Sequence, residues 1–215
     1  MKHITCFIKN IAALLVGAAF CLTAFNGTVH ADDDAGLFLK ALQEKAITQL
    51  SNEDVSLEDR EKQFRTLLKE NFDVEGIARF VIGKYWRKAE TGHRDEFKVI
   101  FEDVMVQRFL PTFNQYASSD FEITKVVPKK SFFIVFSTIK AENGEPAQIL
   151  WRVEKKEDSS SYIITDIAAE GISLRSTYRS DYTSALKSLG GDLSALNSKL
   201  REKVQSGAFA PKESS

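Results

Sequence analysis

The chain is poor in the residue types that carry out much of enzyme chemistry. Its 215 residues include only two cysteines, three histidines and two methionines. Cys6 and Cys21 both lie in an N-terminal segment that we expect to be removed, so the remaining chain has no thiol and His93 is its only histidine. These absences exclude a cysteine nucleophile and a transition-metal site built on cysteine and histidine, and a catalytic triad has little support.

Several sequence motifs of enzymes are also missing. There is no phosphate-binding P-loop, no glycine-rich dinucleotide fingerprint and no nucleophile elbow. The charge is balanced: without Lys2 and Lys9 of the N-terminal segment, 27 of the 29 basic residues face 30 acidic ones, a net charge of −3. This balance argues against a nucleic-acid-binding protein.

The N-terminal segment has the parts of a secretory signal peptide. Lys2 and Lys9 flank the start of an apolar run over residues 11–25, and Val29-His30-Ala31 follows as a small-x-small cleavage site. The alternative, a membrane anchor, needs an apolar run of about 18 residues or more. We therefore predict a periplasmic protein, with the domain boundaries 1–31 for a cleaved signal peptide, 32–205 for one domain and 206–215 for a disordered tail.

Hydrophobic periodicity predicts helices on both sides of a block of strands. Apolar residues at helical spacing predict helices over residues 37–50, 56–72, 73–81, 91–110, 178–189 and 192–204. Ser56 and Asp73 are expected to cap the starts of the second and third helices, and Gly83 is expected to end the third. Alternating patterns predict four strands, at about 121–127, 132–141, 147–155 and 162–174. The short turns between them favour an antiparallel meander. Helices segregated against an antiparallel sheet define an α+β fold.

The strand at residues 132–140, FFIVFSTIK, is apolar on both faces. This pattern predicts an interior strand covered on both sides. The chain also keeps 13 of its 16 phenylalanines after the loss of residues 1–31, many of them on helix faces directed at the sheet. These aromatic side chains suit either a packed core or the wall of a hollow, and composition does not separate the two.

Asp166 is the strongest candidate for chemistry, because it lies between Thr165 and Ile167 in an apolar strand. A buried carboxylate there can serve proton transfer. The alternative is a structural carboxylate that pairs with an arginine or caps backbone groups.

The stretch Phe72–Ala89, FDVEGIARFVIGKYWRKA, resembles the signature of the MlaC or toluene-tolerance family of periplasmic phospholipid-binding proteins. Leu150 and Tyr162 depart from the family pattern, in which an acidic residue and a tryptophan are expected, and they bear on pocket detail and lipid choice. Further matches follow in the family's order, namely Glu96-Phe97, Phe101, Trp151-Arg152-Val153, Asp166, Glu170–Leu174 and Tyr178–Tyr182.

The resemblance implies a nuclear-transport-factor-like fold with an apolar cavity between sheet and helices for lipid acyl chains. It implies no covalent chemistry and no cofactor, with phospholipid as cargo. Its expected partners are the MCE-domain (MlaD-like) subunit of an inner-membrane ABC transporter and an outer-membrane lipoprotein complex (MlaA-like) with a porin, in a pathway that maintains outer-membrane lipid asymmetry. A hopanoid carrier, an enzyme that uses Asp166 and a protein-binding module stay open as alternatives.

Two sets of residues are candidates for the site. The expected lipid-contacting residues are Phe80, Phe97, Phe101, Met105, Phe109, Phe133, Val135, Ile149, Trp151 and Ile172. The expected contacts to a headgroup or partner are Arg79, Lys84, Arg152, Arg175 and Arg179. An arginine at a cavity mouth can hold a phosphate with two parallel hydrogen bonds, and a solvated or structurally paired cation is the alternative for each.

Overall fold

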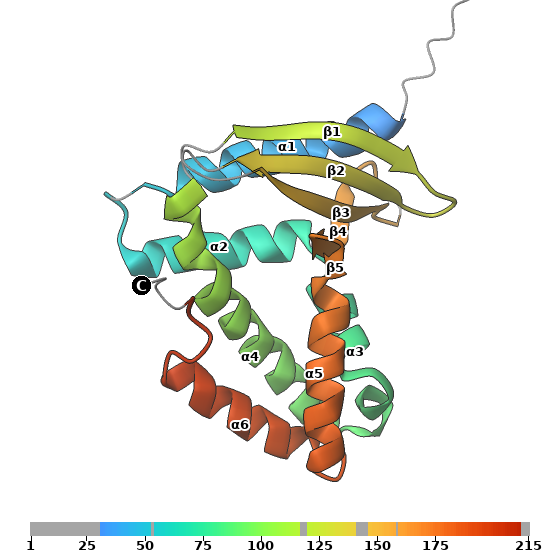
Figure 1. Cartoon of the computed structure of the whole chain (residues 1–215). Helices are drawn as coiled ribbons and strands as arrows, with labels where there is room; N and C mark the ends of the chain where they lie inside the picture. The colour runs from blue at the N-terminus through green and yellow to red at the C-terminus, as the bar shows by residue number, and fades with distance from the viewer. Residues whose placement is uncertain (1–30, 53, 117–119, 141–145, 158, 212–215) are drawn as a thin grey trace, which may run out of the picture.

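The structure is a computed structural model of the chain, and it describes residues 31–52, 54–116, 120–140, 146–157 and 159–211. Over these residues, helices come first, a single five-stranded sheet follows, and two helices end the domain (Figure 1). The predicted α+β class is confirmed. The predicted signal peptide lies outside the described residues apart from Ala31, where the first helix begins.

The described helices and strands follow the predicted order. The α-helices are α1 (Ala31–Leu50), α2 (Leu57–Asn71), α3 (Val74–Ile82), α4 (Thr91–Phe109), α5 (Leu174–Ser188) and α6 (Leu193–Gln205), with 3-10 helices η1 (Gly83–Lys88) and η2 (Leu110–Tyr116). The strands are β1 (Asp120–Pro128), β2 (Phe133–Lys140), β3 (Ala147–Lys155), β4 (Tyr162–Ala169) and β5 (Ile172–Ser173).

Side-chain caps fix where α2 and α3 begin. Ser56 Oγ accepts a hydrogen bond from the backbone N–H of Asp59 at 3.1 Å, and Asp73 Oδ1 accepts one from the N–H of Gly76 at 2.9 Å. Each bond satisfies one of the N–H groups that have no partner in the first turn of a helix. At the other end of α3, Gly83 has a φ of 61°, a value that glycine adopts without strain. The three predicted helix boundaries are confirmed.

The sheet is an antiparallel meander in the order β1-β2-β3-β4-β5. Across it, Val135 of β2 pairs with Trp151 of β3, and Trp151 pairs with Ile167 of β4. Paired residues of neighbouring strands point to the same face of a sheet. Trp151 and its neighbours on that face therefore point together toward the helices.

The prediction of four strands is wrong by one. The fourth predicted strand, 162–174, is divided into β4 and β5 by a turn at Glu170 and Gly171, which have φ values of 51° and 77°. Two successive residues with positive φ reverse the chain in a tight hairpin, so the segment cannot continue as one extended strand.

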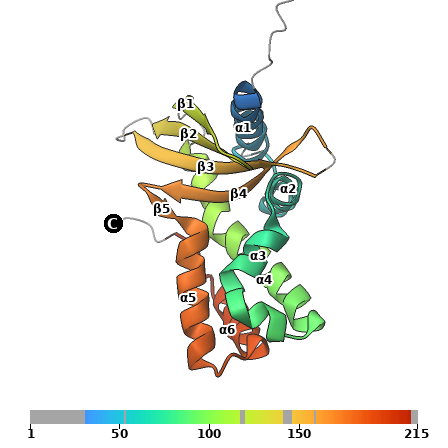
Figure 2. The ribbon, with the colours of Figure 1, turned by 90° about the vertical axis from the view of Figure 1, so that its right-hand side faces the viewer.

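The prediction that the central strand is covered on both sides is also wrong. Val135 and Ser137 of β2 are fully buried, whereas Ile134 and Phe136, which point the other way, are only partly buried. Among the described helices, α1 and α2 lie behind one face of the sheet and none covers the other (Figure 2). The apolar residues on the second face had suggested a cover that the described chain does not provide.

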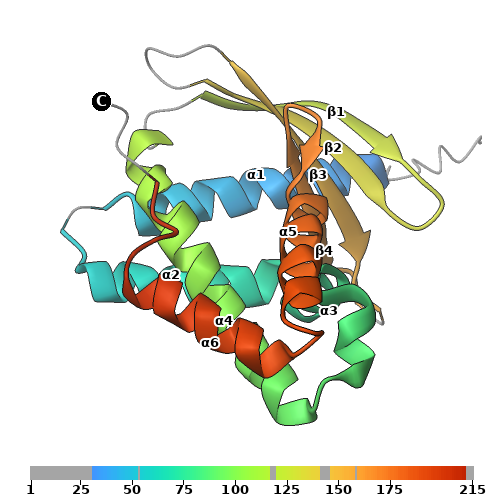
Figure 3. The ribbon, with the colours of Figure 1, turned by 60° about the horizontal axis from the view of Figure 1, so that its bottom comes forward.

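Three clusters of buried side chains hold the domain together. One lies among α3, α4, α5 and α6, where α4 runs beside α6 and α3 beside α5 (Figure 3). A second joins α1 to the sheet, and a third joins α1 and α2 to the end of α4. Between these clusters, the side chains leave a space.

The segment predicted as a disordered tail is partly attached to the domain. The backbone N–H of Phe209 donates to Gln107 Oε1 at 3.0 Å, and the Phe209 ring packs against the first cluster. Phe209, an aromatic residue in an otherwise polar segment, thus attaches residues 206–211 to the domain. The last four residues, 212–215, lie outside the described part of the chain.

Candidate functional site

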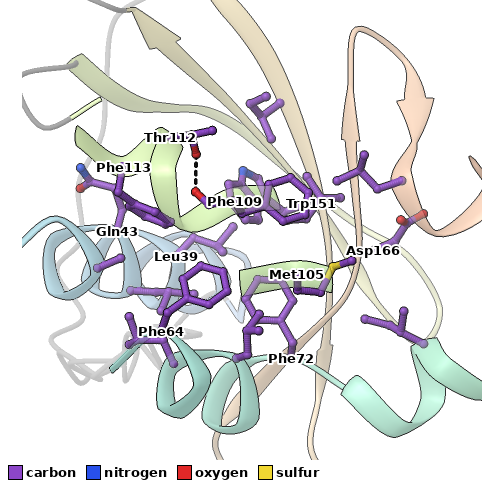
Figure 4. Close-up of a pocket in the computed structure, with 18 of the residues that line it drawn as sticks. Leu39, Gln43, Phe64, Phe72, Met105, Phe109, Thr112, Phe113, Trp151 and Asp166 are labelled. Atoms are coloured by element: carbon purple, nitrogen blue, oxygen red, sulfur yellow. Dashed lines mark hydrogen bonds between the residues drawn. The ribbon is translucent and has the colours of Figure 1, made fainter. Parts of the chain in front are cut away.

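A cavity of about 420 Å³ opens between the sheet and the helices. This volume falls in the range of about 300–1,000 Å³ that is typical of ligand pockets. α1 and α2 form one side, α4 and η2 a second, and β2, β3 and β4 a third, with the start of α5 at one end. Figure 4 shows Met105 and Trp151 near the middle, Asp166 at one end and Gln43 with Phe113 at the other. The apolar wall includes Leu39, Leu42, Ala46, Phe64, Leu67, Phe72, Phe101, Phe109, Phe121, Ile139, Ile149 and Ile167.

Three polar side chains of this wall are bonded to neighbouring protein atoms. Trp151 Nε1 donates to Ser137 Oγ at 2.9 Å, and Thr112 Oγ1 donates to the backbone carbonyl of Phe109 at 2.6 Å (Figure 4). The carboxylate of Glu102 lies 3.3 Å from the ammonium of Lys69. Because these groups are satisfied within the protein, the wall offers mostly carbon to a ligand.

Five of the ten residues predicted to contact lipid lie on the cavity wall. They come from the middle and end of α4 and from β3, and they are Phe101, Met105, Phe109, Ile149 and Trp151. α4 and β3 lie on different sides of the cavity, so residues about 45 positions apart in the sequence share one space.

Three of the other five fill the core. Phe97 is fully buried in the first cluster, with its ring stacked 5.8 Å from that of Phe101. Phe133 and Val135 belong to the second cluster, where the Phe133 ring lies 5.9 Å from that of Tyr162. These three side chains meet other side chains in the core and do not line the cavity, contrary to the prediction.

The remaining two lie outside the cavity. Ile172 is 64% exposed, because the Glu170-Gly171 turn carries it out to the sheet edge. The Phe80 ring is stacked against two guanidinium groups, at 4.4 Å from Arg175 and 4.6 Å from Arg179. Neither residue lines the cavity, contrary to the prediction, because Ile172 follows a turn that ends β4 and the Phe80 ring is covered by two guanidinium groups.

α1, α2 and η2 contribute walls of the cavity that were not predicted from the sequence. Leu42 and Ala46 of α1 and Phe64 and Leu67 of α2 line the cavity, as does Phe113 of η2. The signal was visible, since the four helix residues belong to the apolar stripes that predicted the two helices. A stripe shows which face is turned inward, but it does not tell whether that face meets a side chain or a space.

Asp166 holds the start of α5. Its carboxylate accepts hydrogen bonds from Ser173 Oγ at 2.6 Å and from the backbone N–H of Arg175 at 3.2 Å. A carboxylate at the N-terminus of a helix satisfies a free N–H and interacts favourably with the helix dipole. This arrangement matches the structural alternative for Asp166, that of a carboxylate that caps backbone groups.

Of the five predicted headgroup or partner contacts, only Arg175 reaches the cavity wall. Arg79 pairs with Glu75 at 3.2 Å, and Arg152 pairs with Glu154 at 2.9 Å. The Lys84 ammonium lies over the Tyr85 ring at 5.2 Å, and Arg179 donates to the backbone carbonyl of Phe80. Four of the five cations thus have contacts away from the cavity.

Two tyrosines add neutral polar groups beside the cavity. Tyr178, which lines it, and Tyr182 have buried hydroxyls without a hydrogen-bond partner among the described residues. Burial raises the pKa of both phenols, so both stay neutral at physiological pH.

The described residues hold no group of three or more histidine, cysteine, aspartate or glutamate side chains arranged to bind a metal ion. None of the described helices combines the length and the apolar character needed to cross a membrane.

The fold and the cavity define a class of protein, a small α+β domain with an apolar interior space walled by a sheet and several helices. Within that class, residues 40–202 match the MlaC protein family, and the chain belongs to this family. The family prediction from the Phe72–Ala89 stretch is confirmed.

A solved structure has a similar fold. It is a phospholipid-binding protein from Ralstonia solanacearum in complex with a phospholipid, with a TM-score of 0.70 and 17% sequence identity. The match covers 81% of this chain and 98% of that one. The two proteins therefore share the fold over nearly the whole of the Ralstonia protein.

Proposed function

We propose that this protein is a periplasmic phospholipid carrier that holds acyl chains in the cavity between its sheet and its helices. The observation that carries the proposal is a cavity of about 420 Å³ with a wall of apolar side chains in a domain of the MlaC family. The Ralstonia protein of the same fold, which was solved in complex with a phospholipid, supports the choice of cargo. Export by the predicted signal peptide, residues 1–31, would bring the carrier to the periplasm.

The cavity wall supports a carrier rather than an enzyme. Phe101, Met105, Phe109, Ile149 and Trp151 would contact the chains, together with the residues of α1 and α2 that face them. Asp166, the one candidate for proton transfer, is bonded to Ser173 and to the start of α5. Among the predicted cations, Arg175 is the one placed to reach a headgroup.

We propose that unloading requires a partner. Burial of a 16-carbon chain contributes about 13 kcal/mol at ~0.8 kcal/mol per methylene. Two chains give about 26 kcal/mol before ordering costs, which is above the practical ceiling of about 18–21 kcal/mol for noncovalent affinity. Release into water would be very slow, which fits transfer by direct contact with an MCE-domain subunit of an ABC transporter on one side and an outer-membrane lipoprotein complex on the other.

Mass spectrometry of the protein purified from the periplasm without detergent tests the proposal. The native spectrum should show a stoichiometric adduct, and solvent extraction should identify it as phospholipid. If the adduct is a hopanoid or another apolar lipid, the protein is still a carrier, but its cargo is not phospholipid. A reproducibly empty protein from cells with intact membranes would contradict the carrier and leave an interaction module or an enzyme.

A further inference from the structure

A second pocket, of about 370 Å³, lies next to the cavity and has a different chemistry. Its wall carries two cations, Arg79 and Arg175, and two anions, Asp73 and Glu154. Arg175 and Ile77 line both spaces, so they form the boundary between the apolar cavity and this polar pocket. A molecule with an apolar tail and a polar head could place its tail in the cavity and its head in the polar pocket, with the junction beside Arg175 and Ile77.

Arg175 has an unused hydrogen-bond donor at this boundary. Its guanidinium is stacked on the Phe80 ring at 4.4 Å, which fixes its plane. Its Nε is buried and donates no hydrogen bond to the described residues. It forms an ion pair with Asp166 Oδ2 at 3.8 Å, which is too long for a hydrogen bond. A planar guanidinium held in place with a free donor suits a phosphate oxygen.

The two carboxylates retain acceptor sites. Asp73 Oδ1 accepts from the N–H of Gly76, and Glu154 Oε1 accepts from Arg152 Nε at 2.9 Å and from Thr165 Oγ1 at 3.0 Å. Because an ionised carboxylate has about four acceptor sites on its two oxygens, these bonds leave each group able to accept from an ammonium.

We infer that the polar pocket binds the zwitterionic phosphoethanolamine headgroup of a phospholipid, an inference that rests on the proposed carrier function. Arg175 takes the phosphate, and Glu154 and Asp73 take the primary ammonium. A glycerol headgroup leaves the carboxylates without a cation, and a choline headgroup has no N–H to donate.

A competition experiment tests this inference. Lipid-stripped protein is incubated with vesicles of equimolar phosphatidylethanolamine and phosphatidylglycerol with identical acyl chains, reisolated, and analysed by mass spectrometry. The ethanolamine lipid should be enriched about tenfold, the discrimination expected from one hydrogen bond to a charged group. The same experiment with phosphatidylcholine in place of phosphatidylglycerol should also favour the ethanolamine lipid.

Two variants locate the preference. Glu154→Gln should bring the ratio of bound ethanolamine lipid to bound glycerol lipid close to one. The amide keeps an oxygen that accepts from Arg152 and Thr165, but it loses the negative charge that would attract the ammonium. If Glu154→Gln does not fold, Asp73→Asn serves instead, because asparagine caps helices as well as aspartate. Glu122→Gln on the exposed part of β1 and Arg87→Gln on η1 are matched controls, and both should keep the wild-type ratio.

The outcomes separate the inference from the function on which it rests. If the protein is fully loaded with equal amounts of the two lipids, the headgroup assignment is wrong and the proposed carrier function still holds. Failure to load either lipid overturns the carrier itself. If free phosphoethanolamine binds the stripped protein as tightly as the lipid does, by titration calorimetry, the pocket recognises a small solute and the headgroup assignment is wrong.

Discussion

Single side chains in the wall determine whether the interior of this domain is open to an apolar ligand. Trp151 offers its ring to the cavity, while its one polar atom is bonded to Ser137. Met105, near the centre of the cavity, is a flexible side chain that adapts to irregular apolar shapes (Figure 4). The space therefore depends on the size of a few residues as much as on their polarity.

Met105→Trp should fill part of the cavity and weaken lipid binding. If the indole displaces about three methylenes at ~0.8 kcal/mol each, affinity falls by about 2.4 kcal/mol, or roughly fifty-fold. The amount of lipid that copurifies, together with equilibrium binding of a fluorescent phospholipid, measures the effect. Val99→Trp is the control, since Val99 lies on the same helix and is 59% exposed. Equal lipid content in both variants would contradict the assignment of the cavity as the binding site.

At the scale of elements, the end of α3 and the middle of α5 meet closely at Gly83. A Cβ added there would lie 3.0 Å from Arg179 Nη2. The other terminal nitrogen of this guanidinium, Nη1, donates to the Phe80 carbonyl. The Gly83 backbone, with φ 61° and ψ −129°, is itself a conformation that other residues adopt only with strain. Both constraints require glycine at this junction.

Gly83→Ala should therefore destabilise the domain by about 1–3 kcal/mol, the cost of a residue held in a rare backbone conformation. Denaturant unfolding followed by circular dichroism measures it. Gly92→Ala in the first turn of α4 is the control, because a Cβ there meets nothing within 4 Å, and it should leave stability unchanged or slightly raised. Equal effects of the two substitutions would refute the role of Gly83.

A carboxylate joins α4 to α6. Glu96 accepts a hydrogen bond from Asn197 Nδ2 at 2.9 Å and another from Arg201. The hydrogen bond from Asn197, followed by that from Arg201, lowers the pKa of Glu96. A group whose pKa is lower in the folded state stabilises the fold above its unfolded pKa, about 4.3 for glutamate, and that contribution is lost as pH falls through the folded pKa.

Glu96→Gln should reduce stability at pH 7 by about 1 kcal/mol, a typical net contribution of a hydrogen bond. The difference from wild type should shrink as the pH falls below about 4.3. Thermal unfolding of both proteins between pH 3 and pH 7 measures the trend, with Glu122→Gln as the control that should follow wild type throughout. A difference that stays constant over this pH range would exclude Glu96 ionisation as its cause.

For the whole molecule, the proposed carrier must combine very slow spontaneous release with fast delivery. Loaded protein mixed with empty protein-free vesicles should lose little phospholipid over hours. Vesicles that contain the MCE-domain subunit should receive it much faster, as measured by dequenching of a labelled lipid. Equal rates to both kinds of vesicle would show that no partner is needed and would contradict the proposed unloading step.

The sequence by itself determined the family, the order of helices and strands, and the helix caps at Ser56 and Asp73. These features are local, because a cap, a turn or an apolar stripe depends on residues a few positions apart. The sequence also showed which helix faces turn inward. It did not show the turn at Glu170 and Gly171 that ends β4, since a positive φ at a glutamate is rare.

The tertiary structure alone decided which inward-facing residues line a space and which fill a core. Phe97 and Phe101 are four positions apart on one helix face, yet only Phe101 lines the cavity. Phe97 is fully buried among α3, α4, α5 and α6, with Tyr182 of α5 packed edge-on against it at 5.7 Å. Phe101, one turn further along α4, also contacts Tyr182, but its ring reaches the cavity. A hollow depends on the distance between elements that are remote in sequence, and periodicity carries no information about that distance.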